Sequence, residues 1–577
     1  MRSIGSVLTL CTCLVTATIL DGCASGPTGS STTDSGTGGH TSASGGSAQT
    51  GGAVGSGGLT ASGGMIGSGG STASGGSPGT GGTTGTGGTT ASGGVTGSGG
   101  SAGRGGTIGS GGTTGTGGAT GLGGAVSSGG ATGAGGASGS HGGSNGSGGS
   151  SPTGGTAGSG APGPCDIYQA GNTPCGAAHS TVRALYGAYT GPLYQVQRAS
   201  DKSTKDILVG PGGYADSSVQ DSFCSGTSCT IPIIYDQSPN GNHLRVTWFA
   251  YWLQSGGNPA TANAAKINVG GHSVYGIKSG TNVAYRTGVA LSGTAAINKG
   301  SSTVTFSSPQ TLPANTALLF AANSKDCPAN SWPNNCNFKI YLTASAISAA
   351  TTVTLTTSYA GTSSSSTVVW NQTTKNIATG DQAEAMYSVF DGKTYGNWCC
   401  FDYGNSELPG VDDGNATMEA IYWGADTQFG QSGGGSGPWV AADLENGMYE
   451  GYENGSSKVA SNTSVTGFAY VTAMLKGLSA KDCPTGLTSS GCFALKAGNS
   501  TSGKLAFKFN ADTMNYGARP PGYSPQKKEG AIILGTGGDG SNTGTGIWFE
   551  GAMTMGAPSD ATDDAVQANI VAAGYGH

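Results

Sequence analysis

Between Cys165 and His577, hydrophobic residues occur in short runs and do not repeat with the period of a helix. The runs are rich in Val, Ile, Thr, Tyr and Phe, and turns of Gly, Asn, Asp and Ser separate them. The clearest runs are Thr230–Tyr235, Met418–Trp423, Gly467–Leu475 and Lys504–Phe509. Short β-branched and aromatic runs between turn residues are typical of a β-sandwich. We therefore predict an all-β fold for this region.

Two short segments favour helix, and one longer segment differs in amino-acid composition from the rest. The helix candidates are Ser180–Tyr186 and Asp563–Ala573. Residues 292–368 are rich in Ser, Thr and Ala, with strand-like runs at Ser302–Phe306 and Thr351–Thr357. We predict that residues 292–368 form a small β-rich insertion in the sandwich.

Residues 1–22 have the pattern of an export signal. Arg2 precedes an apolar stretch, which closes on the sequence Leu20-Asp-Gly-Cys23. This closing sequence resembles a bacterial lipoprotein processing site, so Cys23 is the expected point of lipid attachment. The alternative is plain secretion with an unmodified Cys23. Both interpretations place the protein outside the cell or on its surface, with the lipid as its only membrane attachment.

Residues 23–163 have the composition of a flexible spacer. More than half of the 113 glycines of this 577-residue chain lie here, and a Gly-Gly pair recurs every six residues from Gly81 to Gly135. A β-helix would need regular apolar or calcium-binding positions, and the repeat has neither. The segment has too few large apolar side chains to offset the entropy of ordering. We therefore predict a coil that carries residues 164–577 as the folded head.

Charge and motif content exclude several classes of function. Charged residues make up 9% of the chain, the net charge is −6, and no cluster of Lys and Arg appears, so we expect no nucleic-acid partner. The sequence has no Gly-x-Ser-x-Gly elbow, HExxH motif or phosphate loop. The six histidines do not have the spacing of metal ligands, so we expect neither a metal nor another cofactor.

Ten cysteines follow Cys23 and fall into close neighbours. An even number of cysteines in an exported chain predicts disulfides, whereas zinc sites need CxxC or CxxH spacings, which are missing. The neighbouring pairs are Cys165/Cys175, Cys224/Cys229, Cys327/Cys336, Cys399/Cys400 and Cys483/Cys492. A bridge between adjacent cysteines is strained, because consecutive Cα atoms are only ~3.8 Å apart. Cys399 and Cys400 are therefore either a strained bridge, of the kind found at functional sites, or two unlinked thiols.

Carboxylates in Gly- and aromatic-rich surroundings are the remaining candidates for chemistry. Glycosidases use two of them: one attacks or activates water, and the other protonates the leaving oxygen. If Gly437–Asn446 is a strand, period-two alternation places Asp443 and Glu445 on one face. Asp539 follows two glycines, which let the backbone approach a ligand closely. The alternative for each is a solvated acid in a turn.

Several long blocks resemble the catalytic domain of glycoside hydrolase family 54, the α-L-arabinofuranosidase B type. The likeness runs from Cys165 to about Gly576. Its main blocks are Ala178-His-Ser-Thr-Val-Arg-Ala-Leu-Tyr186, Ile233-Ile-Tyr-Asp-Gln-Ser-Pro-Asn-Gly-Asn-His-Leu244, Cys399-Cys-Phe-Asp-Tyr-Gly-Asn405, Asp443-Leu-Glu-Asn446 and Lys528-Glu-Gly-Ala-Ile-Ile-Leu-Gly535. The resemblance implies a β-sandwich of the concanavalin or jelly-roll kind and a retaining mechanism.

The resemblance also assigns roles to residues. It implies that Glu445 is the nucleophile and Asp539 the general acid/base. The bridge Cys399–Cys400 is expected to pack on the arabinose. Asp443, Asn446 and the backbone of Gly538 are expected to hydrogen-bond the sugar, and two family disulfides match Cys165–Cys175 and Cys224–Cys229.

Three departures from the family pattern concern the substrate. A pocket tryptophan of the family aligns with Phe429, which alters the expected pocket wall, and residues 292–368 have no recognised counterpart. The family's fungal members carry a C-terminal β-trefoil arabinose-binding module with no counterpart before His577.

We expect an exo-acting, monomeric enzyme that acts on the plant cell-wall polysaccharides arabinan and arabinoxylan. The alternatives are a carbohydrate-binding surface protein without turnover, a glycosidase of different sugar specificity, and a structural stalk protein, for which paired acids would have no use.

Overall fold

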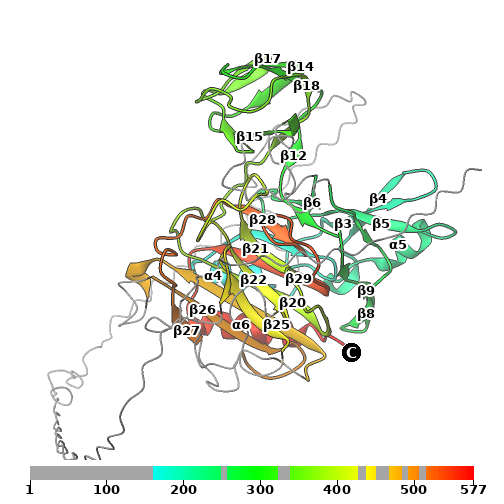
Figure 1. The fold of residues 1–577 in the computed structure, drawn as a ribbon. Coiled ribbons are helices and arrows are strands. Elements are labelled where there is room, and N and C mark those ends of the chain that lie inside the picture. Colours follow the sequence, from blue (N-terminus) through cyan, green and yellow to red (C-terminus); the bar gives the residue numbers. More distant parts are fainter. Residues whose placement is uncertain are drawn as a thin grey trace, which may run out of the picture. The chain divides into compact units, whose positions relative to one another are not determined.

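The computed structural model describes residues 160–577 except 249–255, 323–337, 427–436, 450–464, 466, 484–490 and 506–514. Antiparallel sheets are the main regular structure of these described residues, and Figure 1 shows them in the colours of the sequence. No helix among them is long and apolar enough to cross a membrane.

Two large sheets form the body of the described region. The first contains β2 (Cys175–Ser180), β10 (Ile277–Ser279), β20 (Glu384–Tyr395), β25 (Tyr470–Leu478), β26 (Cys492–Asn499), β27 (Asn515–Ala518) and β29 (Gly546–Met555). The second contains β3 (Pro192–Arg198), β4 (Thr204–Leu208), β5 (Cys229–Ile234), β6 (Leu244–Val246), β7 (Ala260–Thr261), β11 (Tyr285–Arg286), β21 (Asp402–Ser406), β22 (Glu419–Gly424), β23 (Trp439–Asp443), β24 (Met448–Tyr449) and β28 (Ala531–Leu534).

The two large sheets pack face to face around one hydrophobic core. Strand β22 contacts β20 and β25, and β23 contacts β26. Phe390 of β20 and Trp423 of β22 stack across this interface with ring centroids 5.9 Å apart. Central strands such as β22 are buried on both faces, which explains why their sequences are apolar runs without alternation. The predicted β-sandwich is confirmed.

Residues 292–368 contribute most of two further sheets with a core of their own. One sheet contains β12 (Val289–Ala290), β15 (Ala317–Phe320), β16 (Tyr341–Leu342) and β19 (Val369–Asn371). The other contains β13 (Ala295–Ile297), β14 (Thr303–Leu312), β17 (Ile347–Thr354) and β18 (Ser364–Thr367). Buried side chains of both sheets, among them Phe306, Phe320 and Tyr341, form one cluster. The indole of Trp370, in β19, stacks on Trp248 at a centroid distance of 4.8 Å.

Helices are few, and one predicted helix is wrong. Helices α4 (Pro164–Ala170), α5 (Ser217–Phe223) and α6 (Asp560–Ala572), the 3₁₀ turns η4 (Pro211–Gly213) and η7 (Ala480–Asp482), and the hairpin β8 (Lys266–Val269) and β9 (His272–Tyr275) complete the described elements. The expected helix at 563–573 is confirmed as α6, whose N-cap Ser559 accepts from the N–H of Thr562.

The segment Ser180–Tyr186 is not a helix. Ser180 ends β2, and its Oγ accepts hydrogen bonds from the N–H groups of Val182 and Arg183, at 3.1 and 3.0 Å. A serine hydroxyl that binds the backbone two and three residues ahead favours a turn over a helix. The turn directs the Arg183 side chain into the core. The local pattern of hydrophobic residues could not predict this, because the pattern treats an arginine as a surface residue.

The structure contains four of the predicted disulfides. They join Cys165 to Cys175, Cys224 to Cys229, Cys399 to Cys400 and Cys483 to Cys492. Cys327 and Cys336 lie outside the described residues, as do Cys23 and most of the predicted strand 504–509.

A buried ion pair fixes the turn after β2 to the core of the first sheet. Arg183 Nε and Nη2 donate to the two oxygens of Glu550 in β29, at 2.6 and 2.7 Å. The hydroxyls of Tyr387 and Tyr575 also donate to this carboxylate, at 3.0 and 2.7 Å. The Glu550 side chain is fully buried, so its charge depends on these four donors.

Replacing Arg183 by Met should destabilise the protein strongly, because Glu550 would keep a buried charge without its cation. We expect the free energy of unfolding in urea at pH 7 to fall by ~3–5 kcal/mol. Lys481→Met is the control, since Lys481 and its partner Asp482 are both exposed to solvent. Equal losses in the two variants would contradict a special role for the buried pair.

Candidate active site

A cavity of about 690 Å³ opens where several chain segments leave the second sheet. The registers of that sheet bring these segments together: Tyr403 of β21 pairs with Leu534 of β28, and Ala420 of β22 pairs with both Gly404 and Asp443. The start of β21, the end of β23 and the chain after β28 therefore meet at one place. The lining residues come from 281–282, 398–400, 412, 418, 443–449 and 537–543.

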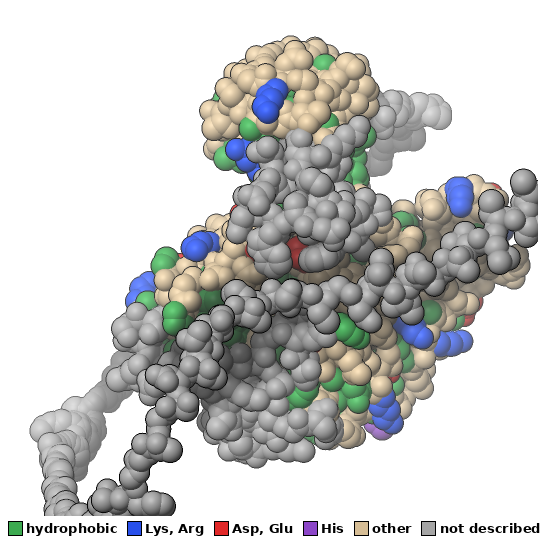
Figure 2. All heavy atoms as spheres, in the orientation of Figure 1, with side chains coloured by type: hydrophobic (Ala, Val, Ile, Leu, Met, Phe, Trp, Pro, Cys, Tyr) green, Lys and Arg blue, Asp and Glu red, His purple; other side chains and the backbone are tan. Residues whose placement is uncertain are grey.

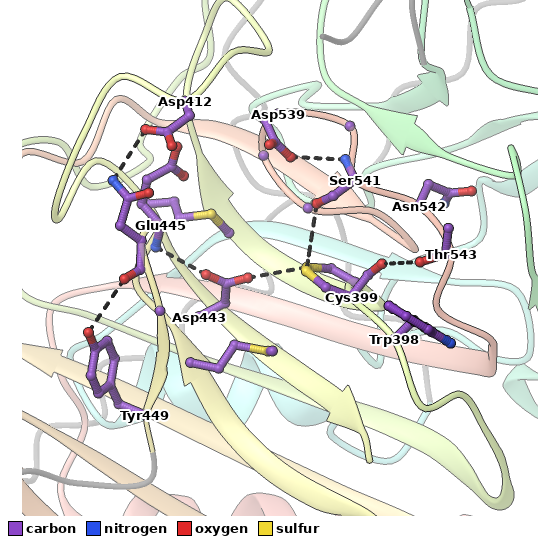
Figure 3. Close-up of a pocket in the computed structure, with 18 of the residues that line it drawn as sticks. Trp398, Cys399, Asp412, Asp443, Glu445, Tyr449, Asp539, Ser541, Asn542 and Thr543 are labelled. Atoms are coloured by element: carbon purple, nitrogen blue, oxygen red, sulfur yellow. Dashed lines mark hydrogen bonds between the residues drawn. A yellow bond between two sulfur atoms is a disulfide. The ribbon is translucent and has the colours of Figure 1, made fainter. Parts of the chain in front are cut away.

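Nearly all of the residues predicted to form a site line this one cavity. Glu445, Asp539, Asp443, Asn446, Gly538 and the pair Cys399–Cys400 are all part of its wall. Figure 3 shows Glu445 and Asp443 on one side, Asp539 with Ser541 on the other, and Cys399 between them. Phe429 lies outside the described residues.

Strand β23 ends earlier than the sequence suggested. It stops at Asp443, and Glu445 has a left-handed backbone with φ of 90°. The prediction that period-two alternation along a strand places Asp443 and Glu445 on one face is therefore wrong. A positive φ is unfavourable for a glutamate, and such conformations cluster at functional sites. The turn brings the N–H of Glu445 to Asp443 Oδ1 at 3.0 Å, which holds the two acids together.

The loop that carries Asp539 is fixed by its own hydrogen bonds. Asp539 Oδ1 accepts from the N–H of Ser541 at 2.9 Å, and the N–H of Gly537 donates to the Ser541 carbonyl at 2.9 Å. A Cβ atom at Gly538 would collide with the buried carboxylate of Glu407. Glycine is favoured at position 538, because any larger residue would have to displace this buried side chain.

The bridge between Cys399 and Cys400 connects the two sides of the cavity. Ser541 Oγ lies 3.5 Å from Cys400 Sγ, and Asp443 Oδ2 lies 3.6 Å from the same sulfur. Cys399, Cys400 and Asp443 also place three potential metal-ligand atoms within 4.8 Å of one another. The sulfurs are in a disulfide, however, and metals bind the thiolate form, so this set does not suit a metal ion.

Burial makes the acids around the cavity hard to ionise. Desolvation raises the pKa of Glu445 well above its usual range, and the carboxylates of Asp539 and Glu529 raise it further. Two groups act in the opposite direction: the backbone N–H of Asp413, which donates to Glu445, and the cation of Arg286. Burial likewise raises the pKa of Asp443 to about 7.

Further acids surround this centre. Burial raises the pKa of Asp413 to about 8, and the adjacent Glu529 carboxyl contributes to the rise. The fully buried Asp402 has a pKa well above its usual range, first because of burial and then because of Asp443.

Arg286, at the end of β11, lies beneath the cavity and is 2% exposed. Its Nη1 donates to the carbonyl of Gly538 at 3.1 Å, and its Nη2 donates to the carbonyl of Glu407. Burial lowers its pKa to about 10, so the guanidinium stays charged at neutral pH. Sequence reasoning missed Arg286, because one arginine in a two-residue strand gives no pattern. It also missed Asp413 and Glu529, although Glu529 lies in a conspicuous Lys-Glu-Gly block.

The arrangement is suited to proton transfer and attack at carbon. Glu445 Oε1, in the cavity wall, has no hydrogen-bond partner among the described residues. An unpartnered carboxylate oxygen opposite a second carboxyl, across an apolar disulfide, can attack a bound ligand while the other acid donates a proton.

Comparisons with known proteins agree with this geometry. Residues 164–310 and 323–576 match the family described as "Alpha-L-arabinofuranosidase B, catalytic". The match includes most of 292–368, so the insertion of that segment stays a prediction.

Alpha-L-arabinofuranosidase B of Aspergillus oryzae is 40% identical over 422 residues, which are 72% of this chain and 63% of that protein. An "Arabinofuranosidase/B-xylosidase" of Trichoderma koningii is 40% identical over 421 residues, with the same two shares. The chain thus spans less than two thirds of the length of these relatives.

Two solved structures are similar over the same region. A GH54 α-L-arabinofuranosidase soaked with a cyclic sulfate inhibitor has a TM-score of 0.51 and 36% identity, covering 72% of this chain and 66% of that one. An arabinofuranosidase complexed with arabinofuranosyl-α-1,2-xylobiose has a TM-score of 0.50 and 35% identity, covering 72% and 65%.

Asp443→Asn should change how stability depends on pH. Because the pKa of Asp443 in the folded protein is about 7, above the ~3.9 of an unfolded aspartate, the folded state binds more protons between these values. Its stability therefore falls as pH rises through that range. The gain in unfolding free energy from Asp443→Asn should be roughly 1–3 kcal/mol larger at pH 8 than at pH 5, measured by urea unfolding.

Asp201→Asn is the control for this experiment. Hydrogen bonds from Ser203 lower the pKa of the exposed Asp201, so it is ionised at both pH values and its replacement should act equally at each. A pH-independent effect of Asp443→Asn would show that Asp443 is not a high-pKa group.

Proposed function

The chain belongs to the family of α-L-arabinofuranosidase B catalytic domains, and on this premise we propose that it is an exo-acting α-L-arabinofuranosidase that retains anomeric configuration. It releases terminal arabinofuranose from side chains of arabinan or arabinoxylan. The observation that carries the proposal is that Glu445 and Asp539 line one cavity, with the bridge Cys399–Cys400 between them.

Glu445 and Asp539 divide the chemistry between them. The Glu445 carboxylate attacks the anomeric carbon, and Asp539 gives its proton to the leaving oxygen as the glycosidic bond breaks. Asp539, now ionised, takes a proton from water, and that water cleaves the ester to Glu445 with a second inversion. The charge of Arg286 and the N–H of Asp413 favour the ionised form of Glu445, which is the form that attacks.

Neighbouring groups hold the sugar in place. Asp443 and Asn446 accept and donate hydrogen bonds to its hydroxyls. The carbonyl of Gly538 already accepts from Arg286, so we assign the Gly538 sugar contact to its N–H. The disulfide offers a rigid apolar surface to one face of the ring.

Substrate and location complete the proposal. A relative's structure contains arabinofuranosyl-α-1,2-xylobiose, which supports arabinoxylan as a substrate class. Residues 1–22 export the chain, Cys23 carries a lipid, and residues 23–163 hold a monomeric head at a distance from the cell surface. A Gly-rich coil of this length has a root-mean-square span of roughly 65 Å, enough to search a polymer.

Glu445→Gln should lower kcat/KM for an aryl α-L-arabinofuranoside by at least ~10³-fold, because the amide cannot form the glycosyl ester. Released arabinose and aryl alcohol are the readouts, with aryl β-D-xyloside and β-D-galactoside as substrate controls and Asp201→Asn as the variant control. Activity that survives in Glu445→Gln would remove Glu445 from the mechanism. Turnover of a control glycoside alone would mean a different sugar specificity, and binding of arabinan without any turnover would mean a carbohydrate-binding protein.

Asp539→Asn should discriminate between leaving groups. Aryl leaving groups need little proton donation, so we expect a loss of ~10-fold or less in the first step with an activated aryl arabinofuranoside, and ~10³-fold or more with an oligosaccharide. Azide, which attacks without a base, should restore turnover and give α-L-arabinofuranosyl azide, identified by NMR. Equal losses on both substrates, or an azide product of β configuration, would contradict the assigned role or the retaining mechanism.

A further inference from the structure

An exposed tryptophan forms part of the cavity wall. Trp398 is 52% exposed and lines the cavity. The other large hydrophobic side chains that the described region exposes are Leu208, Val289, Leu342, Val368 and Tyr395, and none of them lines it. A solvent-exposed indole at a ligand cavity contributes little to the hydrophobic core and is typical of binding surfaces.

Trp398 lies next to Thr543, at the end of the cavity-lining loop that carries Asp539. It directly precedes Cys399, whose carbonyl accepts from the N–H and Oγ1 of Thr543, at 3.1 and 2.8 Å. Thr543 belongs to the same loop as Asp539, so these bonds join the backbone next to Trp398 to the acid's loop. Figure 3 shows Trp398 next to Thr543, with the disulfide between it and Asp443, and with Glu445 and Tyr449 farther away.

This position fixes which part of a substrate the indole can meet. The following argument rests on the proposed function, in which Asp539 protonates the leaving oxygen. The group that departs with that oxygen must then lie on the Asp539 side of the cavity. The disulfide already faces the arabinofuranose, so the indole beyond it faces the next sugar unit.

We propose that Trp398 is the platform of a leaving-group subsite that binds the pyranose unit bearing the arabinofuranose, as in a xylan backbone. A xylopyranose ring with equatorial hydroxyls presents a flat face of C–H groups and no exocyclic hydroxymethyl group, so its face can lie against the indole. A furanose ring is smaller and puckered and offers less contact area. Thr281 and Asn282, also in the cavity wall, supply polar atoms at the rim of this subsite.

The test compares three leaving groups in the full chain. Arabinofuranosyl-xylobiose departs with a pyranose, α-1,5-arabinobiose with a furanose, and methyl α-L-arabinofuranoside without a ring. Trp398→Ala should lower kcat/KM about tenfold for the first and less than about twofold for the other two, because it removes one aromatic contact. Trp398→Phe should keep most of the activity, and Tyr395→Ala, an exposed aromatic outside the cavity, should change none of the three.

Equal losses on all three substrates would overturn the proposal, since Trp398 would then only maintain the shape of the cavity. No loss on any substrate, or a loss confined to arabinobiose, would overturn it as well. Titration of xylobiose into the Glu445→Gln and Glu445→Gln/Trp398→Ala proteins gives a readout that needs no turnover. Xylobiose should bind only where Trp398 is present, and equal binding by both proteins would contradict the subsite. If wild-type protein released no arabinose from any substrate, the proposed function would fail, while this titration would still decide the pyranose platform.

Discussion

Removal of carboxyl groups from water is the constraint on which the active site depends. Glu445, Asp443, Asp413 and Asp402 are held where ionisation is costly. Within the described region, the cation of Arg286 and a few backbone N–H groups offset that cost. Such a site resists holding several negative charges at once, which favours the unequal protonation that a nucleophile and an acid require. The sheet registers matter because they bring chain segments distant in sequence to one end of the sandwich.

The sequence was a good guide to the class of fold and to several acids that line the cavity. Runs such as Met418–Trp423 identified central strands because strands buried on both faces are apolar throughout, and Asp563–Ala573 was recognisable as a helix. The blocks around Cys399, Asp443 and Asp539 pointed to residues that the fold does bring into one cavity. Those blocks could be recognised as a family pattern because they were long and lay in a fixed order.

Local patterns failed where tertiary contacts decide the backbone. The Ser180–Tyr186 segment had acceptable helical spacing, yet the hydroxyl of Ser180 and the pairing of Arg183 with Glu550 impose a turn. Glu445 was placed on a strand face, yet the strand ends two residues earlier and the residue takes a left-handed conformation. Arg286 could not be identified from the sequence, because its role depends on its contacts in the folded protein with the Gly538 carbonyl and the charge of Glu445. Phe429 and the Cys327/Cys336 pair lie outside the described residues and stay predictions.

The disulfide between Cys399 and Cys400 has a consequence for biosynthesis. Its apolar surface does not exist in the newly made chain, which carries two separate thiols until an oxidant joins them. Reducing compartments keep thiols unlinked, whereas oxidising environments such as the outside of the cell allow disulfides to form. Under the proposed export, the cavity is therefore completed only after the chain has left the cytoplasm. Chain retained in the cytoplasm has the two acids but lacks the surface between them, so recombinant production in an oxidising compartment is the route to the complete site.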